Sequence, residues 1–211
     1  AWPPPAPQYR AHLRAQWHAV VRRDVNHPSA LLYCMSNELG GSTLYPRSAW
    51  QCYHETKAIK PNAFVIWTDG GLNEDLPGEF VNAEASEDEK TGKPLVQHEY
   101  RWWSSFPDVR LADRYGGAIR PYGAELARAA ALRHGIAHVL PAAAEMSNRL
   151  QFVEAKAKME LCRRDHPRLA GICHFDAMDA NPSPQGIMTE FYERKYADAA
   201  TWRETNGDTV V

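Results

Sequence analysis

The hydrophobic positions of the chain alternate between helical spacing and short, unbroken apolar runs. Near the start, five side chains recur at spacings of four, four, three and one, which places them on one helix face: Tyr9, Leu13, Trp17, Val20 and Val21. Pro28 ends this pattern, because the residue before a proline disfavours the helical conformation. The run 30–35 then follows without polar interruption, as expected of a strand that is covered on both faces.

The same alternation continues along the chain. Pro46 opens a second predicted helix and Pro61 ends it. Further strands are predicted at 63–67, 79–83, 94–98 and 169–175, with a long loop over 99–123. A later helix is indicated by apolar residues at spacings of four, three, four and four: Met146, Leu150, Val153, Ala157 and Leu161. A final helix is predicted over 189–202, and 206–211 have the pattern of a turn that enters a new strand.

Strands that alternate with helices predict an α/β fold with parallel strands. Two architectures remain open at this point, a doubly wound sheet and a (β/α)8 barrel. A dinucleotide-binding sheet has a glycine-rich turn after a strand, and Asp69-Gly70-Gly71 lacks the required glycine spacing. Five βα units are too few to close a barrel. A barrel therefore requires three more strands on the N-terminal side, and the start "AWPPPAPQ", without an initiator Met, agrees with a fragment.

Composition narrows the functional classes. The 211 residues are 44% hydrophobic and 24% charged, with a net charge of −2, which suits a globular core. Basic residues are scattered among acidic ones, so we expect neither a nucleic acid nor a membrane surface as partner. The four cysteines form no CxxC pair, and His98-Glu99 lacks the second histidine of an HExxH site. We therefore expect no metal and no cofactor.

Candidate chemistry lies at the predicted strand ends. In parallel α/β folds, reacting groups gather where the strands end. Two glutamates follow strands directly, Glu38 after the first and Glu99 after the fourth. The other candidates at strand ends are Asn37, Trp67, Asp69, Glu84, His98, His174, Phe175 and Asp176.

Four stretches resemble segments of glycoside hydrolase family 2. "VVRRDVNHPSALLYCMSNE" is similar to the segment that ends in the acid/base glutamate of that family, which commonly reads R-D-x-N-H-P-S, a strand, then N-E. "PLVQHEYRWWSSFPD" resembles the nucleophile strand, where Q-H-E precedes an aromatic loop. "SPQGIMTEFYERKYA" resembles the stretch after the last barrel strand, and "NGDTVV" the start of a following β-domain.

The resemblance implies an incomplete (β/α)8 TIM barrel, about strands 4 to 8, over 1–205, with 206–211 as the start of a β-domain or linker. Glu38 would be the general acid/base and Glu99 the nucleophile, while Asn37 would bond the sugar 2-hydroxyl. Arg101 is a candidate to keep Glu99 ionised. The other expected substrate contacts are the aromatic Trp67, Trp102 and Trp103, which suit the apolar face of a sugar ring, and the imidazoles His98 and His174.

The geometry of a (β/α)8 barrel gives a separate estimate of the distance between the carboxyl groups of Glu38 and Glu99. Cα atoms at the ends of strands four and seven would lie roughly 14 Å apart across the barrel mouth. Each glutamate side chain reaches about 4 Å inward, so the carboxyl groups would meet at roughly 5–6 Å, near the separation of about 5–5.5 Å in retaining enzymes. The error of about 2 Å leaves an inverting spacing open.

The resemblance also implies a setting for the chain. We expect a carbohydrate substrate, and the missing N-terminal barrel part and β-sandwich domains as partners within a longer chain. The family often works outside the cytoplasm, which makes a periplasmic or extracellular compartment compatible with the sequence. Many relatives have a Trp after the last strand, where this chain has His174-Phe175-Asp176. That departure motivates the alternative, a carbohydrate-binding barrel remnant without catalysis.

Overall fold

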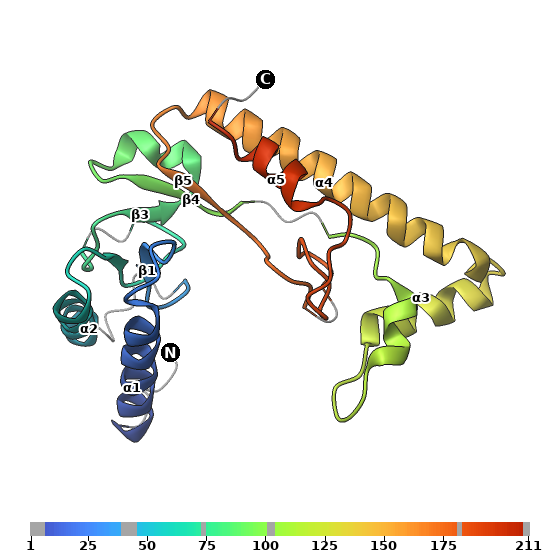
Figure 1. Ribbon diagram of the computed structural model, residues 1–211, viewed down its shortest axis with the longest axis horizontal. Helices are drawn as coiled ribbons and strands as arrows, with labels where there is room; N and C mark the ends of the chain where they lie inside the picture. The colour runs from blue at the N-terminus through green and yellow to red at the C-terminus, as the bar shows by residue number, and fades with distance from the viewer. Residues whose placement is uncertain (1–6, 39–45, 73–74, 101–103, 181–182, 209–211) are drawn as a thin grey trace. The chain divides into compact units, whose positions relative to one another are not determined.

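The computed structural model describes residues 7–38, 46–72, 75–100, 104–180 and 183–208, and it shows a mixed α/β fold with parallel strands (Figure 1). The chain divides into two compact units, which we describe separately. Unit 1 comprises 1–98 and 168–172, and unit 2 comprises 99–167 and 173–211. None of the described helices combines the length and the apolar character that a membrane span requires.

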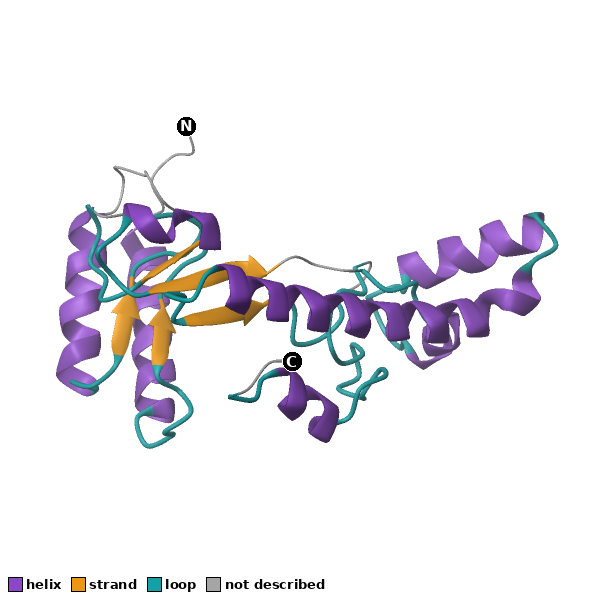
Figure 2. Ribbon diagram, turned by 90° about the horizontal axis from the view of Figure 1, so that it is seen from above, coloured by secondary structure: helices purple, strands orange, loops and turns teal. Residues whose placement is uncertain are grey.

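The strands belong to two small sheets. β1 (Leu32–Cys34) pairs in parallel with β2 (Phe64–Ile66), and β3 (Val81–Ala83) pairs in parallel with β4 (Leu95–Tyr100). β5 (Gly171–His174) completes the second sheet in the order β3-β4-β5. Figure 2 shows β1 and β2 as neighbouring arrows. The predicted strands therefore exist, and β1-β2 and β3-β4 pair in parallel, although most strands are shorter than their apolar runs.

Two helices cover one face of the first sheet. α1 (Pro7–Asp24) and α2 (Pro46–Ile59) contact each other, and their apolar side chains meet β1 and β2 in a core that contains Val21, Tyr33, Ala63 and Val65. Trp17 packs edge-on against Tyr33 and donates from Nε1 to Thr56 Oγ1 at 2.7 Å. Of the helix face predicted from spacing, Trp17 and Val21 pack into this core, whereas Tyr9, Leu13 and Val20 are exposed.

The two sheets do not form one continuous row, because an irregular segment lies beside β2. Residues 77–79 run antiparallel to it: Trp67 N donates to Pro77 O and Glu79 N to Val65 O, both at 3.1 Å. The predicted strand at 79–83 consequently begins only at Val81. A 3-10 helix, η1 (Ala85–Lys90), follows it and leads toward β4.

Glu79 fixes this irregular segment, and its loss should destabilise unit 1. Its carboxylate accepts from Lys57 Nζ at 2.6 Å, from Val65 N at 2.7 Å and from Tyr53 OH at 3.1 Å. Burial alone would raise the pKa of this carboxyl group, but the hydrogen bonds outweigh it and the pKa lies below its ordinary value of 4.5. We expect Glu79→Gln to lower the free energy of unfolding by about 2 kcal/mol, measured by urea unfolding at pH 7.

The lowered pKa of Glu79 determines how its contribution to the stability of unit 1 depends on pH. A carboxyl group whose pKa is depressed by folding stabilises the fold above its unfolded pKa, and that contribution is lost as the pH falls. The difference in the free energy of unfolding between wild type and Glu79→Gln should therefore become smaller as the pH falls below 4.5, the ordinary pKa of this group. Glu87→Gln is the matched control, because Glu87 forms a surface ion pair with Lys90 at 3.3 Å, and such pairs contribute little to stability. Equal stability of the two variants at pH 7 would contradict this role.

Unit 2 is mainly helical. Its elements are η2 (Val109–Arg114), α3 (Tyr122–Arg133), η3 (Ala137–Val139), α4 (Leu140–Asp165) and α5 (Ala199–Thr205). One core joins η2, α3 and the start of α4 through Val109, Ala124, Ala131 and Leu140. α5 packs on α4, where Trp202 meets Phe152 edge-on with ring centroids 5.1 Å apart. The loop predicted over 99–123 thus contains η2.

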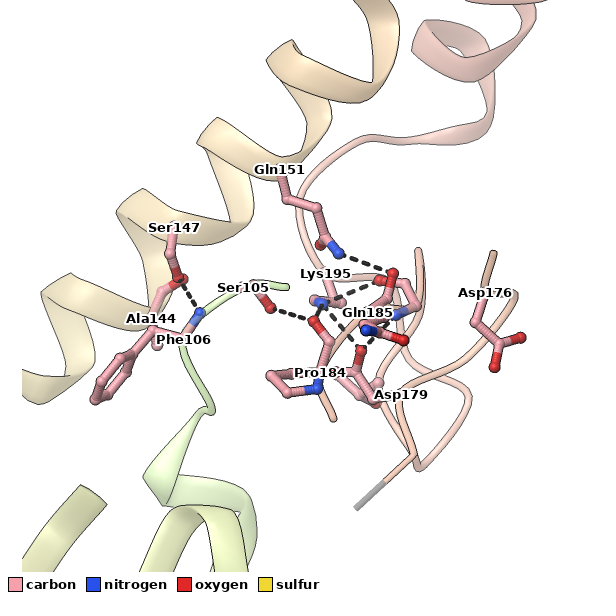
Figure 3. A network of polar contacts seen from close by, with 12 residues as sticks. Ser105, Phe106, Ala144, Ser147, Gln151, Asp176, Asp179, Pro184, Gln185 and Lys195 are labelled. Atoms are coloured by element: carbon pink, nitrogen blue, oxygen red, sulfur yellow. Dashed lines mark hydrogen bonds and ion pairs between the residues drawn. The ribbon is translucent and has the colours of Figure 1, made fainter. Parts of the chain in front are cut away.

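The final helix predicted over 189–202 is wrong, because the residues before 199 are held in turns. Thr189 Oγ1 accepts hydrogen bonds from the backbone N–H groups of Phe191 and Glu193, and Tyr192 has φ 61°. Lys195 is drawn inward, where Nζ donates to Asp179 and to the carbonyl oxygen of Gly186, both at 3.0 Å (Figure 3). The helix begins only after Asp198, whose side chain accepts from Thr201 N at its N-terminus. Within the predicted turn at 206–211, residues 209–211 lie outside the described residues.

Candidate functional site

The ends of β1 and β2 are joined by polar contacts of the backbone. Ser36 Oγ donates to Trp67 O at 2.6 Å, and Asp69 N donates to Ser36 O at 3.4 Å. Because the strands are parallel, both end at the same edge of the sheet, and these bonds hold 36–38 against 67–70. Asn37 and Glu38, which follow the apolar run of β1, therefore lie beside the end of β2.

Three strand ends converge through Asp69 and His98. Asp69 Oδ1 accepts from Glu38 N at 3.2 Å, and Asp69 Oδ2 lies 3.7 Å from His98 Nε2. His98 Nε2 also lies 3.5 Å from Asn37 Oδ1. His98 is buried on β4, so its ring is held in one position between the side chains of Asp69 and Asn37. Unit 1 thus brings together Asn37, Glu38, Asp69 and His98, all of which the sequence pointed to.

Gly70 allows this close approach, and sequence reasoning did not assign it a role. Its φ is +78°, and a Cβ atom placed on it would lie 2.8 Å from Glu38 Cγ and 3.4 Å from His98 Cε1. Its N–H donates to Asn82 O at 2.9 Å, which ties the loop to β3. The Gly-Gly pair after a predicted strand marked a loop, but only coordinates show that a side chain there would displace Glu38.

Both candidate catalytic glutamates have left-handed backbone conformations. φ is 53° at Glu38 and 35° at Glu99. For a residue other than glycine such a conformation costs about 1–2 kcal/mol, and it concentrates at functional positions. Glu99 follows His98 directly on β4 and is half-buried, whereas Glu38 is exposed. Both strained residues lie close to the C-terminal end of a strand, since Glu38 follows β1 after a short segment and Glu99 precedes the last residue of β4.

The remaining predicted residues have different fates. Trp67 is half-buried at the end of β2 and lines a groove of about 840 Å3 in unit 1, together with Ser36, Trp17 and Arg14. Arg101, Trp102 and Trp103 lie outside the described residues. His174 belongs to unit 2, where its ring meets Trp202 edge-on with centroids 5.8 Å apart and its Nε2 atom is buried. Asp176, on the segment after β5, is half-buried.

The residue types at this edge could also hold a metal ion. A carboxylate oxygen of Glu38 lies within 4.8 Å of a ring nitrogen of His98, and Asp69 contributes a second carboxylate next to the same ring. Carboxylate and imidazole groups are ligands of divalent transition metals. Two-carboxylate sugar chemistry uses carboxylates without an ion, so removal of metals distinguishes the two uses of the site.

Comparison with known proteins supports the fold class. Neither the models of protein families nor the curated proteins contain a match to this sequence. Among solved structures, the chain is similar to a beta-glucuronidase of an uncultured Clostridium species, with 10% sequence identity and a TM-score of 0.51. The likeness covers 93% of this chain and 36% of that protein, so the chain spans about a third of its length. At this identity the likeness concerns the fold, and that fold is one used by a glycoside hydrolase.

Proposed function

We propose that this chain is part of a retaining glycoside hydrolase that cleaves a terminal sugar from a β-glycoside or from a polysaccharide-derived oligosaccharide. Glu99 is the nucleophile and Glu38 the general acid/base. The observation that carries the proposal is the convergence of Asn37, Glu38, Asp69 and His98 at the ends of three strands, with Glu99 next along β4. The distant likeness to a beta-glucuronidase supports it.

The proposed reaction has two displacement steps. In the first, a Glu99 carboxylate oxygen attacks the anomeric carbon while Glu38 donates its proton to the leaving oxygen, which breaks the glycosidic bond. In the second, Glu38 removes a proton from water, which attacks the same carbon and releases Glu99. The anomeric configuration is inverted twice and is therefore retained.

Neighbouring side chains have assigned roles in this proposal. Asn37 hydrogen-bonds the sugar 2-hydroxyl, a contact that strengthens in the transition state. His98, held by Asp69 and Asn37, positions the sugar and the Asn37 amide. Trp67 offers an indole face to the apolar side of a ring, in a groove whose size lies in the usual range of small-molecule sites. Trp102 and Trp103 are further candidates for stacking. His174 is left out, because its Nε2 atom is buried within unit 2.

The finer family assignment follows the sequence motifs. We propose membership of glycoside hydrolase family 2, with this chain as about strands 4 to 8 of a (β/α)8 barrel. The first three strands, and β-sandwich domains of a longer chain, would then complete the substrate pocket. The exposed Leu32 and Phe64 on β1 and β2 agree with further strands that would cover them.

The proposed function is tested by the stereochemistry of the product. The natural protein that contains this chain should hydrolyse aryl β-glycosides, and proton NMR during the first minutes should show the β-anomer of the free sugar before mutarotation. An α-anomer would indicate an inverting enzyme. Saturable sugar binding without hydrolysis would favour the alternative, a carbohydrate-binding barrel remnant.

Removal of metals should leave hydrolysis unchanged. After dialysis against EDTA, we expect kcat/KM for an aryl β-glycoside to stay within about twofold of the untreated protein, because both steps use carboxylates and water alone. Activity lost with EDTA and restored by a divalent ion would instead make Glu38, Asp69 and His98 ligands of a catalytic metal.

A further inference from the structure

Two buried polar atoms line a small cavity in unit 2, and within the described part of the chain neither accepts or donates a hydrogen bond. Its walls come from α4, from the end of β5, from the segment before α5 and from α5 itself. His174 Nε2 and Asn148 Oδ1 are both buried, and neither has a hydrogen-bond partner among the residues that the structure describes. Both residues line this one cavity. A ring nitrogen and an amide oxygen that remain unpaired in the interior of a protein are costly unless a further molecule bonds to them.

Two other polar side chains of the cavity wall, Gln151 and Lys195, are already engaged in hydrogen bonds. Gln151 donates from Nε2 to Gln185 O at 2.9 Å, and Lys195 donates to Asp179 and to the carbonyl oxygen of Gly186 (Figure 3). These groups therefore have hydrogen bonds of their own, in contrast to His174 Nε2 and Asn148 Oδ1. A molecule that binds in the cavity must form one hydrogen bond with His174 Nε2, which is a donor or an acceptor, and must donate another to Asn148 Oδ1.

The cavity has the size of one water molecule. Its volume is about 10 Å3, and the smallest space that holds a water is roughly 10–15 Å3 by the same kind of measure. Burial lowers the pKa of His174, while Asp176 acts in the opposite direction and Lys195 adds to the effect of burial. The imidazole is therefore neutral at pH 7, and water, which both donates and accepts, fits whichever proton position Nε2 has.

We propose that this cavity binds one internal water molecule that bridges His174 Nε2 and Asn148 Oδ1. The water links the end of β5 to α4 beneath Trp202, so it belongs to the packing of unit 2. Buried waters of this kind make two to four hydrogen bonds to groups that would otherwise be unpaired. The inference is independent of the proposed glycosidase activity, and it assigns His174 to the protein interior.

The test combines detection of the water with a double-mutant cycle. In the 15N-labelled chain, nuclear Overhauser transfer from water to the Trp202 indole N–H or the His174 ring should reveal a long-lived water. Asn148→Leu and His174→Phe should each lower the midpoint of thermal unfolding by about 2–4 °C, because each leaves the other atom unpaired. The double variant should lose clearly less than the sum, since both unpaired atoms are gone.

Matched variants on exposed residues exclude general effects of the substitutions. Asn62→Leu and His12→Phe introduce the same side chains at exposed positions of unit 1 and should leave the midpoint within about 1 °C. If either core variant prevents folding, His174→Gln, which keeps a polar atom near Nε2, should fold and retain the water signal. Additive losses in the cycle, or no transfer from water in the wild-type chain, would overturn the proposal in favour of a dry cavity.

Discussion

Replacing Glu99 by Gln in the natural protein is expected to lower kcat for an aryl β-glycoside by a factor on the order of 10^4. An amide lacks the negative charge with which the carboxylate attacks the anomeric carbon, so no glycosyl-enzyme can form. The measurement is release of nitrophenol at saturating substrate. Undiminished turnover would remove Glu99 from the mechanism.

Glu38→Gln should behave differently, which separates the two proposed roles. General acid catalysis contributes about 10^2–10^4-fold, and its loss is felt most when the leaving group is a poor one. We therefore expect a large fall in kcat/KM for an alkyl or sugar leaving group, and a smaller fall for nitrophenolate, which departs without a proton. If both variants showed the same dependence on the leaving group, the assignment of acid/base and nucleophile would fail.

Glu84 provides the matched control for both variants. It follows β3 directly, as Glu38 and Glu99 lie at the ends of their strands, and it is exposed. It accepts a hydrogen bond from Gln97 and belongs to none of the sequence motifs. Glu84→Gln should keep kcat within about twofold of wild type, because the amide oxygen of Gln can still accept the hydrogen bond from Gln97 Nε2.

The sequence predicted the elements that are specified locally. Pro46 and Pro61 bracket α2, and the run 30–35 contains β1, because proline geometry and apolar continuity act over a few residues. The spacing of Met146, Leu150 and Val153 correctly predicted α4, yet these side chains are exposed, and α4 buries Phe152, Ala155 and Met159 instead. Periodicity identifies a helix, but it does not say which neighbour covers which face.

Features that depend on contacts distant in sequence were not predictable. The region 189–198 has residues that a helix tolerates. Its irregular path is explained by the turn at Thr189 and by the distant contacts of Lys195 with Asp179 and with the backbone oxygen of Gly186. In the candidate site, too, the local features were predictable and the contacts between residues distant in sequence were not. Strand ends marked Asn37, Glu38 and His98, whereas the bond from Glu38 N to Asp69 Oδ1 spans 31 residues and was not foreseen.

Replacing Gly70 by Ala should lower activity far more than it lowers stability. The added Cβ would lie 2.8 Å from Glu38 Cγ, so the Glu38 side chain has to move, and φ of +78° adds a backbone cost of about 1 kcal/mol. A displacement of about 1 Å at a catalytic group reduces turnover by about 10^2-fold. We expect a fall of that size in kcat/KM, while the variant remains folded by circular dichroism.

Gly135→Ala separates the effect of the clash from the effect of the backbone. Gly135 has φ +69°, close to that of Gly70, but a Cβ atom there would meet nothing within 4 Å. Both variants should lower the free energy of unfolding by about 1 kcal/mol, since each forces an L-residue into the left-handed region. Only Gly70→Ala should reduce kcat/KM, because only there does the new methyl group reach the proposed acid/base. Equal activity of the two variants would mean that the position of Glu38 against Gly70 does not matter for catalysis, and Asp69 and His98 would then be structural supports of the sheet edge.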